Sequence, residues 1–459
     1  MREQRQKQMN LAPEWLAFDH ARELQAISGL LDANPTAAVL VWQDLVAAGL
    51  ASDIQQRGPE GLSASQVLRA LIVKQLNGFS YRELEFHLGD SQTYRRFCEL
   101  GWDQTASKSA LGSGIKAIRA ETLEQINHLV VQTAGRLKVE DGKRVRADTT
   151  VVDSNIHAPL DSNLLWDSVR VLTRLMAAAQ EILGQNVHFG NRTRRAKRRA
   201  LGILNARNNE KREPLYRDLL KVARETIDSA DEVTKVIDQV TKQGDLDVLT
   251  TMIELGAIGK QIAHYIPLAR RVVDQTQRRV LQGESVPSGE KLVSIFEEHT
   301  DIIVKDRRDT FYGHKICLTT GRSTLVTDCV ILQGNPADST LAEQVIDRHI
   351  EIMGHAPRQV AFDGGFTSKP NLDALKAKGV VDVSFSKARS LSVTEMVRSS
   401  WVYKKLRNFR AGIEATISFL KRSFGMDRCT WRSLPSFKSY VWSSIVTFNL
   451  LVLARHQLA

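Results

Sequence analysis

The organisation of the chain follows from one segment, Lys143-Arg-Val-Arg-Ala-Asp148-Thr-Thr-Val-Val-Asp153. The β-branched residues after Asp148 predict a β-strand with an acid in its middle. An ionised aspartate near the core of a sheet is costly unless a cation lies against it. The segment alone leaves two explanations open. Asp148 pairs with Arg144 or Arg146, or it belongs to a cluster of acids drawn from other parts of the chain.

Two further acids far downstream favour the cluster. The segment from Arg358 to Gly365, Arg-Gln-Val-Ala-Phe-Asp-Gly-Gly, predicts a short strand that ends in Asp363 and a glycine pair. Glu414 lies on a predicted helix with Arg410 and Lys421, and spacings of four and seven residues place the three on one helix face. The alternative for Glu414 is an ion pair with Arg410 on a solvated helix, worth a few tenths of a kcal/mol, on the order of 0.3.

Composition limits the class of protein. The chain has 459 residues, 42% of them hydrophobic and 25% charged, which predicts about two to four soluble globular domains. Its net charge of +11 indicates a polyanionic partner, although a membrane surface would also fit. No stretch is expected to span a bilayer, and the first ten residues, MREQRQKQMN, lack the apolar core of a signal peptide. The four cysteines are far apart in the sequence, which favours free thiols in a reducing cytoplasm.

The N-terminal region is predicted to be helical. Two helices are expected from about residue 13 to residue 50, with Leu16 on the first, and a longer helix is expected from about Ser113 to Thr133. Between them, residues 62–100 contain two capping boxes, Ser63 to Gln66 and Ser80 to Glu83, and then a short basic helix. This order is typical of a helix-turn-helix, and simple helix packing is the alternative. In the DNA-binding interpretation, the side chains that could reach a groove are Arg82, Arg95 and Arg96.

A second helical block is predicted at residues 161–299. Its apolar residues recur at helical spacing, and residues 192–212 carry a dense run of positive charge. Such a run is usually a solvated face, but this density favours contact with phosphates. The arginines expected to make that contact are Arg194, Arg195, Arg198 and Arg199.

From residue 301 the apolar period changes from 3.6 to 2. Strands are predicted at 302–304, 313–320 and 325–332, followed by helix 341–349, the Asp363 strand, helix 371–378 and strand 381–385. This order is an α/β pattern with a mixed sheet. The Asp148 strand has no partner nearby in sequence, so we expect it to join this sheet, with the helical block as an excursion.

Three acids brought together would repel one another. Divalent cations with oxygen ligands remove the conflict, and two such ions can activate a nucleophile and stabilise the leaving oxygen in a displacement at phosphorus. The glycine pair after Asp363 would let a substrate approach the backbone closely. Arg410 and Lys421 would then hold the phosphates of the strand to be cut.

Three motifs resemble the DDE transposases of bacterial insertion sequences, and the resemblance is closest to the ISNCY-type family. They are Asp148-Thr-Thr-Val-Val-Asp-Ser-Asn-Ile, Phe362-Asp-Gly-Gly-Phe, and Arg410-Ala-Gly-Ile-Glu414 with Lys421-Arg-Ser-Phe-Gly. Related enzymes carry a Tyr-x-x-Arg-x-x-x-Glu-x-x-x-x-x-x-Lys pattern, in which Arg407 here replaces the tyrosine. That departure affects DNA contacts and leaves the three acids intact.

The resemblance implies a multidomain chain: a helical DNA-binding region at 1–137, a ribonuclease-H-like α/β catalytic core at 138–160 and 300–459, and the helical basic insertion at 161–299. It implies that Asp148, Asp363 and Glu414 bind two Mg²⁺ or Mn²⁺ ions. The expected activity is cleavage at transposon ends and strand transfer into target DNA. The expected assembly is a homodimer or higher oligomer on double-stranded DNA. The expected location is the bacterial cytoplasm, in association with the nucleoid and not with a membrane. Two alternatives stay open: an inactive domesticated DNA-binding protein, and a metal-dependent nuclease without end specificity.

Overall fold

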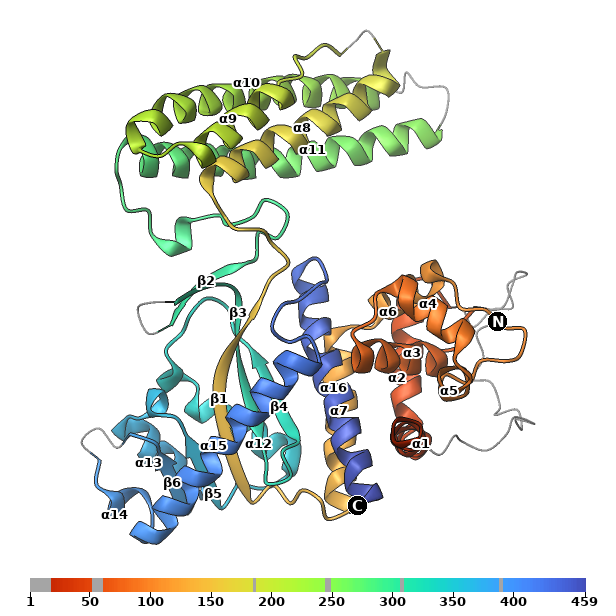
Figure 1. Cartoon of the computed structure of the whole chain (residues 1–459), viewed down its shortest axis with the longest axis vertical. Coiled ribbons are helices and arrows are strands. Elements are labelled where there is room, and N and C mark those ends of the chain that lie inside the picture. The colour runs from red at the N-terminus through yellow and green to blue at the C-terminus, as the bar shows by residue number, and fades with distance from the viewer. Residues whose placement is uncertain (1–17, 52–60, 185–186, 244–248, 306–308, 388–390) are drawn as a thin grey trace. The chain divides into compact units, whose positions relative to one another are not determined.

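The computed structural model describes residues 18–51, 61–184, 187–243, 249–305, 309–387 and 391–459 (Figure 1). The chain forms two compact units: residues 1–155 with 313–459, and residues 156–312. The first unit contains both the N-terminal helices and most of the sheet. The second unit overlaps the helical block expected at 161–299. The predicted start of the first helix, with Leu16, lies outside the described residues.

Seven helices precede the first strand in the described residues: α1 Asp19–Asp32, α2 Thr36–Ala47, α3 Ala64–Asn77, α4 Tyr81–Asp90, α5 Gln92–Phe97, α6 Lys108–Ala117 and α7 Ala120–Arg136. Both predicted capping boxes are confirmed. The Gln66 amide donates to Ser63 Oγ at 3.2 Å and the Ser63 amide donates to Gln66 Oε1 at 2.9 Å, with the same exchange between Ser80 and Glu83. These caps satisfy amides that helix geometry leaves unpaired, so they set where α3 and α4 begin.

The prediction of one long helix from Ser113 to Thr133 was wrong. The structure breaks the helix at Ile118 and Arg119, between α6 and α7. The Arg119 amide donates to Asp44 Oδ2 at 2.9 Å, its guanidinium pairs with the same fully buried carboxylate, and its backbone is extended. A contact with α2, distant in sequence, therefore outweighs local helix propensity here.

The sheet is mixed, as predicted. Its strands are β1 Arg144–Asp153, β2 Asp301–Lys305, β3 Asp309–Thr320, β4 Val326–Ile331, β5 Gln359–Phe362 and β6 Asp382–Phe385. The order is β2-β3-β1-β5-β6, and β4 also pairs with β3. The β1 strand lies antiparallel to β3 and parallel to β5, so the expectation that the Asp148 strand joins this sheet is confirmed.

Helices cover the sheet. Helices α12 Ala342–Met353 and α13 Lys369–Ala377 occur between the strands, followed by the short α14 Val393–Met396. The long α15 Ser400–Ser423 packs against β1, β5 and β6, as Figure 1 shows. An apolar core of side chains such as Phe362, Val383 and Leu406 joins these elements. Because α15 crosses β1 and β5, its side chains meet those of both strands.

The last helix, α16 Leu434–Leu458, corrects the expectation that no stretch is long and apolar enough to cross a bilayer. Its 25 residues pass that test by length and composition, with a mean hydropathy of 1.3 over the best window. Yet 89% of that window is buried inside the protein, against α7, α1 and α3. A helix that is apolar on all sides and packed on all sides is equally typical of a protein core.

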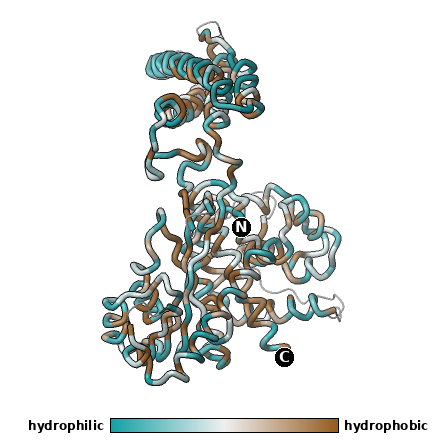
Figure 2. The backbone as a smooth tube through the Cα atoms, turned by 60° about the vertical axis from the view of Figure 1, so that its left-hand side comes forward, coloured by the Kyte–Doolittle hydropathy of each residue, from teal (hydrophilic) through white to brown (hydrophobic). Residues whose placement is uncertain are grey.

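Among its described residues, the second unit contains four α-helices: α8 Asp161–Leu183, α9 Thr193–Asn205, α10 Asn209–Gln243 and α11 Leu249–Thr276 (Figure 1). The predicted apolar face of α8, from Leu165 to Leu183, is buried in their shared core. Along these helices the tube of Figure 2 mixes brown and teal, as expected when each helix turns one face inward. This unit therefore has a core of its own.

Candidate active site

The register of the sheet brings two of the three predicted acids together. In the parallel pairing of β1 with β5, Ala147 lies opposite Phe362. The next residue on each strand is an acid, Asp148 on β1 and Asp363 directly after β5. Because both strands rise by the same distance per residue, Asp148 and Asp363 lie at the same height along the paired strands.

The third acid reaches the same place from α15 through a shared arginine. One nitrogen of Arg410, Nη2, lies 3.1 Å from Asp148 Oδ2, 3.5 Å from Asp363 Oδ1 and 3.0 Å from Glu414 Oε1. Asp148 and Arg410 are largely buried, whereas Glu414 is 61% exposed. The structure thus gathers Asp148, Asp363, Glu414 and Arg410 into one group, which we call the acid cluster.

The competing explanation for Asp148, a pair with Arg144 or Arg146, was wrong. Arg144 donates to Gln359 at 3.0 Å. Arg146 donates to Thr320 Oγ1 at 2.9 Å and to the Phe409 carbonyl, and lies over the Phe409 ring at 4.5 Å. The positive charge that compensates Asp148 is the guanidinium of Arg410 on α15.

A glycine allows α15 to lie this close to β1. A Cβ at Gly412 would overlap the buried Arg146 guanidinium, so a larger residue would have to displace either that side chain or the helix. Gly412 stands two residues after Arg410 and two before Glu414. The close approach therefore positions both acid-cluster residues of α15 against Asp148.

The two aspartates differ in their proton affinity. Burial raises the pKa of Asp148, and the Asp363 charge adds to that effect, against the Thr149 amide and Arg410, which lower it. Burial also acts to raise the pKa of Asp363. It is outweighed by hydrogen bonds from Ser386 and the Gly364 amide and by nearby positive charge, so that pKa lies below its ordinary value. Asp363 therefore stays ionised to a lower pH than Asp148, which holds a proton more readily.

The glycine pair after Asp363 has a different role from the one predicted. A Cβ at Gly364 would lie 2.9 Å from Lys387 Cβ, and a Cβ at Gly365 would lie 2.7 Å from Asp338 Oδ2. The space beside both glycines is therefore taken by the protein's own side chains. Asp338 in turn accepts a hydrogen bond from Thr149 at 3.1 Å and pairs with Lys315 at 2.6 Å. The glycines let the Asp363 turn pack against these side chains.

A groove of about 580 Å³ opens beside the exposed acid. Lys421 and Arg422 supply positive charge along it, and Lys421 Nζ lies 3.6 Å from Asp427. The groove is lined by Thr149, Thr150, Glu414, Ile417, Ser418, Lys421, Arg422 and Asp427. The predicted phosphate contact at Lys421 thus lies in an open groove, whereas Arg410 is engaged with the acids.

The donor chemistry of the acid cluster suits a divalent cation. Three carboxylates and one guanidinium leave a formal charge of −2, and hard ions such as Mg²⁺ prefer carboxylate oxygens. Their oxygens do not form the tightest acidic group among the described residues. They surround Arg410, so an ion bound by all three acids would have to replace its guanidinium.

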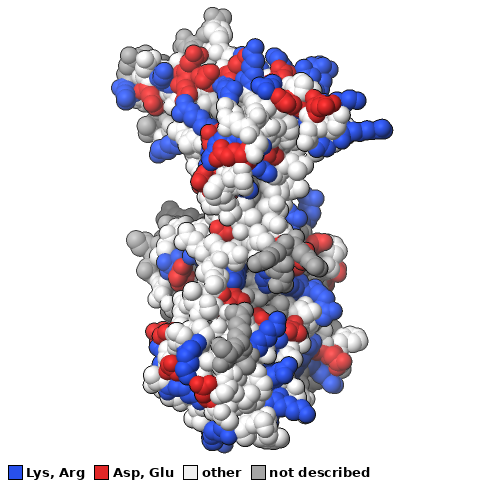
Figure 3. Space-filling model, turned by 90° about the vertical axis from the view of Figure 1, so that its left-hand side faces the viewer, with Lys and Arg blue, Asp and Glu red and all other residues white. Residues whose placement is uncertain are grey.

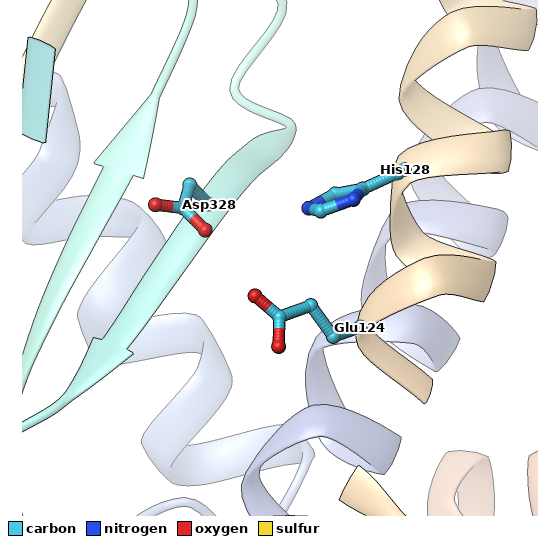
Figure 4. A group of neighbouring side chains, drawn as sticks. All are labelled: Glu124, His128 and Asp328. Carbon is cyan, nitrogen blue, oxygen red and sulfur yellow. The ribbon is translucent and has the colours of Figure 1, made fainter. Parts of the chain in front are cut away.

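A tighter group lies elsewhere in the same unit. Ligand atoms of Glu124, His128 and Asp328 all lie within 4.8 Å of one another, and Figure 4 shows the first two projecting from α7 toward Asp328 on β4. Arg348 pairs with both acids, at 2.6 Å from Asp328, and burial lowers the pKa of His128. The arginine already balances most of this charge, so the group fastens α7 to the sheet.

The predicted DNA-contact arginines of the N-terminal helices have different surroundings. Arg95 donates to the carbonyls of Leu88, Gly101, Trp102 and Gln104, so its guanidinium holds the turn after α5. Arg96 is half-buried, and Arg82 is exposed on α4. Arg82 is the one whose side chain is presented to solvent.

The basic helix α9 also divides its arginines between two roles. Arg195 and Arg199 both pair with Asp218 on α10, whereas Arg194 and Arg198 are exposed and have no carboxylate partner in the described part of the chain. Figure 3 shows acidic and basic side chains interspersed over the bundle. Only part of the charge run is therefore available to a partner.

Comparison with known families adds two matches. Residues 299–450 match the family described as transposase DDE domain, and residues 19–112 match the family described as transposase domain (DUF772). The first span includes Asp363 and Glu414 but not Asp148, which the sheet supplies from outside it. No curated protein and no solved structure matches the chain. The two family matches support an insertion-sequence transposase without singling out a group within that class.

Proposed function

We propose that this chain is a DDE transposase that cuts DNA at transposon ends and joins the freed ends to target DNA. The observation that carries the proposal is the convergence of Asp148, Asp363 and Glu414 around Arg410. The two aspartates come from neighbouring parallel strands and the glutamate from the helix packed on them. A ribonuclease-H-like catalytic core and membership of the ISNCY-type family are part of the same proposal.

Asp148 and Asp363 are the residues we assign to hold a pair of Mg²⁺ or Mn²⁺ ions, with Glu414 completing the set. When bound, such ions activate a hydroxyl nucleophile and stabilise charge on the leaving oxygen of a phosphodiester. The protein's contribution is to fix three acids on rigid elements and to leave Glu414 open to the groove. Because the pKa of Asp148 is raised, Asp148 is the acid of the two aspartates whose protonation would compete more with cation binding as pH falls.

Arg410 has two roles in the proposal. Without metal it neutralises part of the charge of the acid cluster. If cations were bound by the acids, the Arg410 guanidinium would be free to bind a phosphate, for which its paired donors are suited. Lys421 and Arg422 lie further along the groove and are assigned to the phosphates of the cut strand.

Double-stranded DNA is the proposed partner, both as transposon end and as target. The N-terminal helices, with Arg82 exposed, are assigned to end recognition, and the exposed arginines of α9 to phosphates. Cleavage and joining of two transposon ends requires two copies of the site. We therefore propose a homodimer or a higher oligomer on DNA, acting in the cytoplasm.

The test is a cleavage and strand-transfer assay. The purified chain, Mg²⁺ and duplexes taken from the DNA on either side of its coding sequence are mixed with a plasmid target, beside the Asp148→Asn variant. Joined products that require Asp148 are the expected result. Cuts without joining would favour a nuclease, and binding without cuts would favour a domesticated DNA-binding protein. Either outcome would overturn the proposal.

A further inference from the structure

The N-terminal half of α15 carries basic and aromatic side chains that the proposed active site does not use. Residues 400–413 contain no aspartate or glutamate, and Lys404, Lys405 and Arg407 are exposed. None of the three has an ion pair with a carboxylate in the part of the chain that the structure describes. Free positive charge on an ordered helix is the feature expected of a phosphate-binding surface.

This surface is continuous with the groove. Lys404, Arg407, Ala411, Glu414, Ser418 and Lys421 recur every three or four residues, so they form one stripe along α15. The residues next to Glu414 on this stripe are small, which leaves room for a polymer backbone to run along the helix. A polymer bound at Lys421 can therefore run along the helix, past Glu414, to Lys404.

Trp401 ends the stripe. Its side chain is 66% exposed, and Lys405 Nζ lies 4.8 Å from its ring centroid. A single cation over an indole covers one face of the ring, and the high exposure leaves the ring open to a second planar group. Aromatic rings set among cations are the means by which proteins hold unpaired bases without sequence preference.

We propose that Trp401, Lys404, Lys405 and Arg407 bind a single-stranded stretch of DNA that flanks the cut site, with a base stacked on Trp401. Glu414 lies thirteen helical steps after Trp401, which is about 20 Å along the axis. At the duplex rise of about 3.4 Å per nucleotide step this distance spans about six nucleotides, and an extended single strand spans it with fewer, so the stacked base lies at most about six nucleotides from the phosphate at Glu414. The assignment rests on the proposed function for the identity of the polymer, but it concerns residues outside the acid cluster.

The experiment measures binding and not cleavage. The Asp148→Asn chain, in which cutting is disabled, is titrated against a blunt duplex and against the same duplex with a short single-stranded extension. Trp401→Ala should weaken binding of the extended duplex about 5- to 150-fold and leave the blunt duplex unchanged. Lys404→Gln with Lys405→Gln should lower the salt dependence on the extended duplex by about 1.4 log units per log unit of salt.

The matched control is Ile253→Ala on α11, because Ile253 is 64% exposed but lies outside α15 and outside the helices assigned to DNA. It should change neither affinity. Equal weakening of both duplexes by Trp401→Ala, or no weakening, overturns the inference, as does a change in oligomeric state with DNA binding intact. Because no cut is required, a chain that fails strand transfer can still show Trp401-dependent binding, and the two proposals are separately testable.

Discussion

Two basic helices of this protein use arginine in opposite ways. On α15, one guanidinium, that of Arg410, contacts three carboxylates, which leaves the group with a net charge of −2. On α9, one carboxylate, that of Asp218, contacts two guanidiniums, which leaves that group with a net charge of +1. The first arrangement needs cations and the second can accept anions. The ratio of arginines to carboxylates, and not the number of arginines, distinguishes the proposed metal site from α9, where Arg194 and Arg198 stay exposed for the proposed phosphate contacts.

The largest expected effect comes from removing the acids of the first group. Asp148→Asn, Asp363→Asn and Glu414→Gln should each abolish cleavage, because each removes charge that holds metal, worth several kcal/mol of barrier, about 4 or more. End binding should stay close to normal, because the DNA contacts lie elsewhere. A cleavage assay beside a gel shift measures both. Asp373→Asn on α13 is the control, and normal cleavage by any acid variant removes that residue from the site.

Arg410 tests the charge balance directly. In metal-free protein, Arg410→Gln leaves three acids uncompensated and should cost about 2 kcal/mol of stability, less than for a fully buried pair because Asp363 and Glu414 are partly exposed. Mg²⁺ should restore much of the loss, since binding to the folded state stabilises it. Thermal melts with and without Mg²⁺ measure the effect.

A second arginine provides the comparison for that experiment. Arg398 pairs with Asp382, a single buried acid, at 2.9 Å. Arg398→Gln should also lower the melting temperature, but Mg²⁺ should not restore it, because one carboxylate is a poor site for the ion. Equal rescue of both variants would show that the three acids do not act together.

The arginines of α9 outside the Asp218 group are tested by salt. Replacing Arg194, Lys197 and Arg198 with Gln should lower the slope of log K against log salt on duplex DNA by up to about 2.7, because each lost phosphate contact is worth about 0.9. Replacing Arg195 and Arg199 should change the slope less and the stability more, since both are engaged with Asp218. Fluorescence anisotropy over a salt series measures the slopes. Identical slopes for both sets contradict the division of α9 into two roles.

The smallest effect concerns protons. Burial raises the pKa of Asp148 above its unfolded value, so the folded protein holds more protons than the unfolded chain between those two pKa values. Stability of metal-free protein should therefore fall as pH rises through that window, and Asp148→Asn should remove this part of the pH dependence. Metal binding requires the ionised form of Asp148, so the Mg²⁺-induced rise in melting temperature should shrink as pH falls through the same window. Melts over a pH series, with and without Mg²⁺, test both signs.

Local pattern determined much of this protein. Two capping boxes, the strand around Asp148, the mixed α/β order after residue 301 and the apolar face of α8 all follow from short-range periodicity and hydrogen-bonding chemistry. The three acids and their neighbours on α15 are also contained in short motifs. These features are predictable because the forces that produce them act within a few residues along the chain.

Tertiary structure decided which charges meet. The spacing of four residues pairs Arg410 with Glu414, but nothing local shows that Arg410 also joins Asp148 and Asp363, that Arg146 stacks on Phe409 or that Arg95 holds a turn. The break between α6 and α7 depends on Asp44, and the group of Glu124, His128 and Asp328 unites residues from two distant segments. Electrostatic partners are set by distance in space, and the packing of the apolar cores determines those distances. A sequence can therefore name the charged residues, but only the packed sheet and helices pair them.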